Sequence, residues 1–342
     1  MPPMTLRSAM PSLATFRFRF GLAAVLLLAA CGGPQSVFEP RGPDAERLLT
    51  LTWVLFIGGT AIFVGVMGLI GYALVARPDR TRRLSGNHLV LWGGFVFPIV
   101  TLAVLTTYSA WTTSALTATP REEPLRVEVI GHMWWWEVRY PGEPGMPDAV
   151  TANEIRIPVG RPVEVTVTTA DVIHSFWVPN LHGKIDLIPG HVNRRVITAH
   201  EPAVMRGQCA EFCGAQHAWM AFAVVAEEPE RFEEWLERQR EPAPEPREPL
   251  LREGREAFIA QGCGACHRVR GVPLAEGDLG PDLTHVGSRH LIAAGRLENG
   301  VGALAGWIAS SQHLKPENLM PSFDRLDGPT LRAIARWLES LE

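Results

Sequence analysis

Four side chains that can bind a metal lie close together in residues 208–220, QCAEFCGAQHAWM. Cys209 and Cys213 supply two thiols, His217 an imidazole and Met220 a thioether. This combination of ligands suits copper in an electron-transfer site. A single copper would use one cysteine, two histidines and a weak methionine, so the second cysteine indicates two copper ions bridged by two thiolates, each capped by one histidine.

Two other interpretations of this loop are a zinc site and a disulfide. Zinc also takes cysteine and histidine ligands, but the soft thioether of Met220 favours copper. A disulfide between Cys209 and Cys213 suits an oxidising compartment, yet it leaves His217 and Met220 without a role. A second capping imidazole must come from elsewhere in the chain, and His174, in DVIHSFWVP, is the upstream candidate.

A second pair of cysteines lies in GCGACH, where Cys263, Cys266 and His267 form the C-x-x-C-H signature of covalent haem attachment. The two thiols can add to the haem vinyl groups while the histidine supplies an axial imidazole. Methionine is the usual sixth ligand in electron-carrying cytochromes, and Met320 is the only methionine after His267. Three histidines remain as alternatives for a bis-histidine site: His285, His290 and His313.

The segment that must position the first motif has the pattern of β-strands. Apolar and polar residues alternate over 125–129, 155–159 and 163–168, with Pro and Gly between the runs. Period-two patterning of this kind predicts a small antiparallel sandwich or barrel, which we place at residues 121–238. The fold class expected here is all-β.

The haem motif lies in a separate module. Residues 239–250 contain EPAPEPREP, a composition typical of an extended, semi-rigid linker. The module at 251–342 ends in GPTLRAIARWLESL, whose apolar residues share one face of a helix. We therefore expect an all-α domain, and GPDL at 280–283 resembles the loop beside the proximal histidine in class I cytochromes c.

Two apolar runs before these modules are long enough to cross a membrane, 48–76 and 88–108. They predict a two-helix transmembrane hairpin within 48–120. The connecting RPDRTRR is arginine-rich, which favours the cytoplasmic side and places 31–47 and both later modules outside. No Asp or Glu lies between Asp79 and Glu122, so the hairpin offers no intramembrane carboxylate for proton relay.

The first thirty residues resemble a bacterial export signal of the lipoprotein type. Arginines precede the run GLAAVLLLAA, and LAAC at 28–31 resembles a lipobox that would place an acylated Cys31 at the mature N-terminus. The five cysteines are then divided among lipid, copper and haem, so none remains for a disulfide. The formal net charge of −4 gives no sign of a nucleic-acid partner.

Three segments, GHMWWWEVRY, DVIHSFWVPNLHGKIDLIPG and QCAEFCGAQHAWM, resemble subunit II of cytochrome c oxidase, which carries the dinuclear CuA centre on a cupredoxin fold. The resemblance implies bridging thiolates, capping imidazoles and two weak axial ligands: Cys209 and Cys213, His174 and His217, and Met220 with the backbone carbonyl of Glu211. It also implies that the Glu211 side chain helps to hold Mg²⁺ or Mn²⁺ at the interface with subunit I. Trp134 matches a tryptophan near the point where electrons enter, although core packing and membrane anchoring also explain the run 134–136.

With its fused cytochrome module, the multidomain chain resembles subunit II of a caa3-type oxidase. The resemblance implies that electrons pass from a donor, such as a cytochrome or a quinol:cytochrome c reductase, through the haem and CuA to haem a of subunit I, where O2 is reduced. It implies a bacterial cell membrane with further membrane subunits. A CuA-type nitric oxide reductase is the alternative, and the partner subunit distinguishes the two. A glutamate found near the cytoplasmic end of the second helix in many members is absent here.

Mass spectrometry of the mature protein is expected to find an acylated Cys31 at its N-terminus, because the export signal would be removed before that residue. Detection of an intact Met1, or of an N-terminal Cys31 without a lipid, would contradict the lipoprotein interpretation. Neither result would change the interpretation of the two metal sites.

Overall fold

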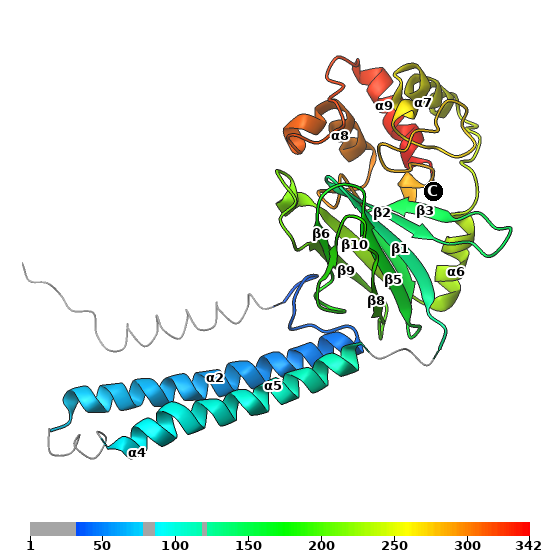
Figure 1. Ribbon diagram of the computed structural model, residues 1–342. Helices are drawn as coiled ribbons and strands as arrows, with labels where there is room; N and C mark the ends of the chain where they lie inside the picture. The colour runs from blue at the N-terminus through cyan, green and yellow to red at the C-terminus, as the bar shows by residue number, and fades with distance from the viewer. Residues whose placement is uncertain (1–31, 78–85, 118–121) are drawn as a thin grey trace, which may run out of the picture.

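The computed structural model describes residues 32–77, 86–117 and 122–342. Figure 1 shows a helical hairpin that runs away from a β domain (122–238), and a helical C-terminal domain (249–342) that lies against another side of the β domain. The predicted export signal at 1–30 and Cys31 lie outside the described residues. So do the arginines beyond residue 77 in the loop that connects the two apolar runs.

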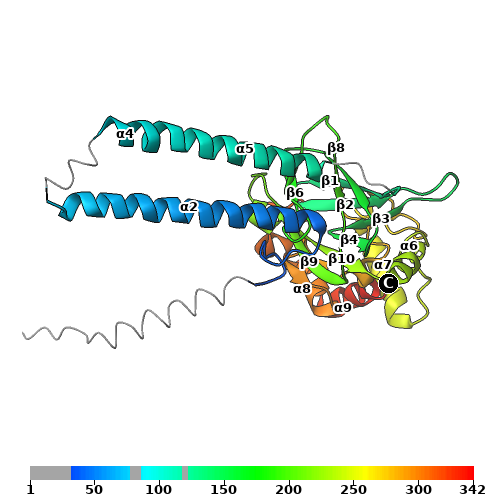
Figure 2. The same cartoon turned by 90° about the horizontal axis from the view of Figure 1, so that it is seen from below.

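The hairpin consists of two helical stretches that lie side by side in both views (Figures 1 and 2). The first is α2 (Pro43–Val75), and the second joins α4 (Asn87–Leu89), the π-helical η2 (Val90–Val96) and α5 (Phe97–Leu116). Each stretch has a window of mean hydropathy 2.2 with none of its residues buried in the protein. By length and composition, both can therefore cross a membrane, and both extend beyond the runs predicted from the sequence.

The segment before α2 is attached to the β domain. Arg41 N donates to the carbonyl oxygen of Asn180 (2.7 Å), and His200 N donates to that of Arg41 (2.8 Å). The chain also re-enters the β domain soon after α5. Both outer ends of the hairpin therefore lie on the β-domain side, as the transmembrane prediction requires.

The β domain is a sandwich of two five-stranded sheets, ordered β3-β2-β1-β5-β8 and β4-β10-β9-β6-β7. Its elements are β1 (Leu125–His132), β2 (Trp135–Tyr140), β3 (Ala149–Ala152), β4 (Glu154–Pro158), β5 (Val163–Thr169), β6 (His174–Trp177), β7 (Ile185–Leu187), β8 (Asn193–Ile197), β9 (Ala203–Cys209), the 3-10 turn η3 (His217–Trp219), β10 (Ala221–Glu227) and α6 (Pro229–Arg238).

The expectation of purely antiparallel pairing was wrong. β1 pairs with β5 in parallel, with Val127 opposite Val165, and β10 pairs with β4 in parallel. The alternation of apolar residues predicts which face of a strand is buried, but it carries no information on strand direction. Here the chain passes through β2, β3 and β4 between the two partners β1 and β5, and so returns in the same direction.

Aromatic rings fill the space between the sheets. Trp136 is fully buried, and its ring centroid lies 5.1 Å from that of Phe222, which stacks on Phe176 at 4.9 Å. A Cβ atom at Gly207 would lie 2.1 Å from the Phe222 ring, so the missing side chain on β9 makes room for it. This packing fixes β9, the strand that ends at Cys209, against β10 and β6.

The C-terminal domain consists of helices joined by loops, with one short hairpin of two-residue strands. Its elements are α7 (Pro249–Ala260), η4 (Cys263–Ala265), η5 (Val286–Ser288), β11 (Leu291–Ile292), β12 (Leu297–Glu298), α8 (Val301–Leu314) and α9 (Gly328–Glu339). Helices α7 and α9 cross closely at Gly254, which has no side chain. A Cβ atom at this position would lie only 2.1 Å from the carbonyl oxygen of Ala333. Beside this crossing, Phe258 meets Trp337 edge to face at 5.0 Å.

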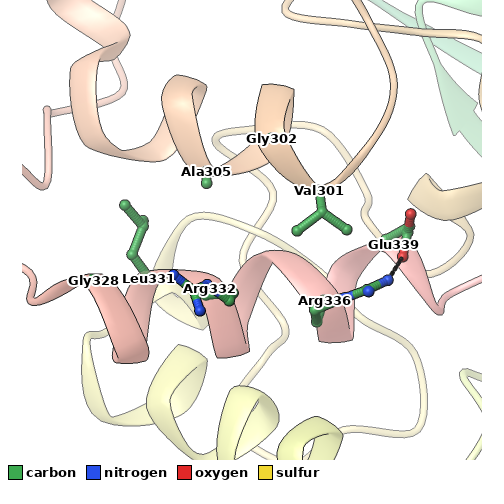
Figure 3. A pocket seen from close by; sticks show the side chains of 8 residues that line it. All are labelled: Val301, Gly302, Ala305, Gly328, Leu331, Arg332, Arg336 and Glu339. Atoms are coloured by element: carbon green, nitrogen blue, oxygen red, sulfur yellow. Dashed lines mark hydrogen bonds and ion pairs between the residues drawn. The ribbon is translucent and has the colours of Figure 1, made fainter.

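A groove of about 580 Å³ lies between α8 and α9, and Figure 3 shows the side chains that line it. Val301 and Ala305 line one wall, and Leu331, Arg332 and Arg336 line the other. None of the predicted haem-binding residues lines this groove. It is therefore not the site predicted for the haem.

The proline-rich segment between the domains is held on the surface of the C-terminal domain. Ala243 N donates to the carbonyl oxygen of Arg270 (2.8 Å), and Arg270 Nη1 donates to that of Arg240 (3.1 Å). His285 Nε2 lies 3.0 Å from the carbonyl oxygen of Glu241. Residues 239–248 have no helix or strand, whereas the last two residues of the predicted linker belong to α7, and several backbone groups of the segment are fixed.

Candidate copper and haem sites

Two cysteines and two histidines converge where β9 leads into the loop before β10. Cys209 Sγ lies 3.7 Å from Cys213 Sγ and 3.8 Å from His174 Nδ1, and Cys213 Sγ lies 3.6 Å from His217 Nδ1. The ligand atoms of His174, Cys209 and Cys213 all lie within 4.8 Å of one another, and these three residues are buried. The structure therefore brings His174, from β6, to a loop that begins 35 residues later.

The two weaker donors lie at the same place. Met220 Sδ is 3.8 Å from Cys213 Sγ, and the backbone carbonyl oxygen of Glu211 is 3.1 Å from Cys209 Sγ. Met220 is fully buried. All six donors named from the sequence thus face one small volume, and this mixture of thiolate, imidazole and thioether fits copper.

The two thiols are free and share one environment. Their sulfurs are 3.7 Å apart, far beyond the ~2.05 Å of a disulfide bond. The Cys213 thiol lowers the pKa of Cys209 far below that of an ordinary thiol, because it stabilises the neighbouring thiolate. A metal-binding thiolate is therefore available at neutral pH.

Asp171 orients one of the imidazoles, and sequence reasoning missed it. Its Oδ1 lies 2.8 Å from His174 Nε2, while Oδ2 accepts from Met133 N at 2.6 Å. Because Nε2 faces the carboxylate, Nδ1 is left to face the sulfurs. Such a carboxylate fixes the tautomer and ring orientation of a metal-binding histidine. An aspartate three residues before a candidate ligand was the only signal in the sequence.

Trp134 lies directly on the metal-binding loop. Its indole Nε1 donates to the carbonyl oxygen of Cys213 at 2.8 Å, and a Cβ at Gly214 would lie 3.0 Å from its ring. Core packing explains its neighbour Trp136, which is fully buried. Trp135 instead stacks on His132 at 4.3 Å. Of the three tryptophans, Trp134 is the one whose indole is hydrogen-bonded to the loop backbone.

The side chain of Glu211 points to an exposed ion-pair cluster. Lys184 Nζ lies 3.1 Å from Glu211 Oε2 and 3.2 Å from Asp186 Oδ1. Ser175 Oγ also donates to Asp186 (2.8 Å), and these contacts lower the pKa of the Asp186 carboxyl. Two carboxylates therefore share one cation, directly beside the carbonyl that faces the copper ligands.

In the C-terminal domain, Cys263 and Cys266 are free; Cys263 is the first residue of η4, and Cys266 directly follows it. The His267 Nδ1 atom lies 2.8 Å from the carbonyl oxygen of Pro281, and burial lowers the pKa of this imidazole. A Cβ at Gly280 would lie 2.6 Å from His267 Cε1, so the loop packs closely on the ring. This leaves Nε2 free to bind iron, and the arrangement fits covalently attached haem.

Met320 lies in a fixed loop between α8 and α9. Its backbone N donates to Asn318 Oδ1 and its carbonyl accepts from Ser311 Oγ, both at 2.8 Å. Two of the alternative histidines are engaged elsewhere. The His285 ring nitrogens both face backbone carbonyl oxygens at 3.0 Å, and His290 Nδ1 lies 2.9 Å from Glu154 Oε2 in the β domain.

Comparison with known proteins matches both domains. Residues 125–227 match the family described as cytochrome c oxidase subunit II, periplasmic domain, and residues 251–342 match cytochrome c. Cytochrome c oxidase subunit 2 of Alkalihalophilus pseudofirmus is 32% identical over 93% of this chain and 94% of its own, and that of Bacillus subtilis is 28% identical over 93% and 95%. The periplasmic domain of subunit II from Bradyrhizobium japonicum, a crystal structure, is 33% identical over 35% of this chain and 95% of its own, with a TM-score of 0.32.

The two matched domains and the apolar hairpin define a membrane-anchored electron-transport protein with one copper domain and one cytochrome c domain. The likeness extends over nearly the full length of the relatives. The chain belongs to the cytochrome c oxidase subunit II family. Membership implies CuA copper in the β domain and haem c in the C-terminal domain, and partnership with subunit I.

Replacing Asp171 by Ala is expected to weaken copper binding by ~10- to 100-fold, because the His174 ring loses the group that orients it. Copper affinity measured by competition with a chelator checks this, and EPR should show altered hyperfine splitting in the remaining bound fraction. Glu143→Ala, on the exposed β2–β3 connection, is the matched control. An unchanged affinity in Asp171→Ala would show that the carboxylate does not orient the ligand.

Proposed function

We propose that this chain is the subunit through which electrons enter a caa3-type, proton-pumping terminal oxidase. The C-terminal domain accepts electrons, and the β domain passes them to haem a of subunit I, where O2 is reduced to water. The observation that carries the proposal is the convergence of six copper-donor atoms in a β domain that contacts a haem domain of the same chain.

In the β domain, Cys209 and Cys213 are placed to bridge two metal ions and His174 and His217 to cap them. Met220 and the Glu211 carbonyl are placed as weak axial ligands. Bound copper supplies one-electron chemistry that no side chain here has. The donors are carried by β6, by the end of β9 and by the loop through η3, and strand pairing holds β6 and β9 next to each other in the sandwich.

In the C-terminal domain, Cys263 and Cys266 are placed for thioether bonds, with His267 and Met320 as axial ligands. A thioether ligand raises the haem potential, which suits a domain that receives electrons from a respiratory donor. The donor class is a cytochrome or a quinol:cytochrome c reductase.

Part of the copper loop is open to solvent. Phe212 is 76% exposed, and the Glu211 side chain is half exposed beside it. We assign this side to subunit I, with the Glu211 carboxylate contributing to an Mg²⁺ or Mn²⁺ site there. In a bacterial cell membrane the hairpin would pack on subunit I, and both domains would lie on the outer side.

The purified chain is expected to bind two copper ions that share one unpaired electron. Metal analysis together with EPR checks this, because hyperfine splitting from both copper nuclei distinguishes a mixed-valence pair from a single copper. The Cys213→Ser variant should lose the shared-electron signal, because one bridge is gone. A wild-type spectrum with splitting from only one nucleus would refute the dinuclear site.

Replacing Met320 by Ala is expected to leave the haem covalently attached, because both cysteines remain. The haem potential should fall, and the weak long-wavelength band of methionine-ligated ferric haem should disappear. Met146→Ala, at an exposed position of the β domain, is the control. Wild-type protein that lacks the band when oxidised would point to a histidine ligand instead.

A further inference from the structure

The C-terminal domain is attached to the β domain by contacts other than the connecting segment. Ala221 N donates to the carbonyl oxygen of Ala294 (3.0 Å), and Arg206 Nη1 donates to that of Gly295 (3.1 Å). The guanidinium of Arg296 lies over the ring of Trp219, 4.4 Å from its centroid. The β11–β12 hairpin thus rests on β9, β10 and the copper loop.

Lys315 lies at the centre of this contact and is only 2% exposed. Its ammonium lies 3.1 Å from the carbonyl oxygens of Trp134 and Trp219 and 3.4 Å from that of Ala293. Three carbonyl acceptors match the three N–H donors of one ammonium group. Removing such a charge from water is costly unless it is hydrogen-bonded in this way, so the arrangement favours a single docked position.

The identity of this residue is itself informative. The chain uses arginine almost throughout and contains only two lysines, Lys184 and Lys315. A guanidinium is a planar fork suited to carboxylates, whereas a compact ammonium can point at three carbonyls that converge on one point. The site at Lys315 therefore requires lysine for a geometric reason.

Two of the three carbonyls that hold Lys315 belong to the copper loop and to the tryptophan that rests on it. Trp219 lies between His217 and Met220, and the Trp134 indole donates to the Cys213 carbonyl. Gln216, next to His217, adds a contact by donating to the Pro316 carbonyl oxygen at 2.6 Å. The C-terminal domain is thus fixed directly to the backbone that carries the copper ligands.

The same segment also carries the proposed haem ligand. Asn318 Nδ2 donates to the carbonyl oxygen of Lys315 (2.6 Å), and Asn318 Oδ1 accepts from Met320 N (2.8 Å). A short chain of hydrogen bonds therefore joins the Met320 backbone to the copper loop through Lys315 and Pro316. The rate of electron transfer falls steeply with the distance between the two centres. A fixed separation between the Met320 segment and the copper loop would therefore keep this rate constant.

We propose that Lys315 is a positioning residue that holds the Met320 segment against the copper loop, so that electrons cross within a permanently docked pair of domains. This inference rests on the proposed function of the two sites. Other contacts lie away from the copper loop: Glu154 binds His290, and the buried Arg289 donates to Thr151 Oγ1 at 3.2 Å. Loss of Lys315 should therefore loosen the segment without releasing the domain.

The test compares Lys315→Met with wild type in the assembled oxidase, with Arg332→Met on the exposed side of α9 as the matched loss of a cation. The haem is reduced by a flash, and the first-order rate at which it then reduces the copper is measured. This rate is expected to fall about tenfold in Lys315→Met and to stay unchanged in Arg332→Met, because only the first variant loses the charge-assisted hydrogen bonds to the carbonyls. Amide hydrogen exchange at residues 315–320 should become faster. Lys315→Arg should restore the rate only in part, because a planar guanidinium cannot point its N–H groups at three converging carbonyl oxygens as an ammonium can.

Copper EPR, haem absorption and both potentials are measured on the same samples, so that a change in driving force is separated from a change in docking. An unchanged rate and unchanged exchange in Lys315→Met, with both centres intact, would overturn the positioning role and leave the proposed function standing. Absence of the mixed-valence copper signal in the wild type would instead overturn the proposed function.

Discussion

Two buried sulfurs held 3.7 Å apart without a bond are the constraint on which the rest of the protein depends. Cys209 ends a strand fixed on both sides, and Cys213 lies in the loop that follows, so the separation is set by the sandwich. Ionisation of both sulfurs at this distance would place two like charges together, and two bound cationic metal ions would offset that repulsion.

In the proposed electron path, the loop lies between the C-terminal domain and subunit I. On one side, Trp134, Gln216 and Trp219 contact the C-terminal domain. On the other side, Phe212 and Glu211 are open, and we assign that side to subunit I. One short segment can thus receive electrons from a domain of its own chain and offer them to another subunit. A flexible tether would supply a high local concentration of donor, whereas a docked domain supplies a fixed distance.

Much of this could be predicted from the sequence, because the decisive signals are local. The cysteine and histidine spacing indicated copper and haem, and two long apolar runs indicated the hairpin. The parallel pairing of β1 with β5 was missed, because residue alternation is the same in either strand direction. Asp171 was missed because an aspartate three residues before a histidine does not by itself indicate that the two side chains meet. Lys315 was missed because its role depends on partners far away in the chain, such as Trp134, 181 residues earlier. The sequence of either domain alone contains no pattern that predicts the contact between the two domains.

The central claim is that electrons enter at the haem domain and leave through the copper loop. Stopped-flow spectroscopy of the assembled oxidase, mixed with a small reductant, follows both centres at once through their separate absorption bands. The account predicts that the haem is reduced first and that copper follows at a rate independent of reductant concentration, because the second step occurs within one chain. Reduction of copper before haem in the intact protein would contradict it.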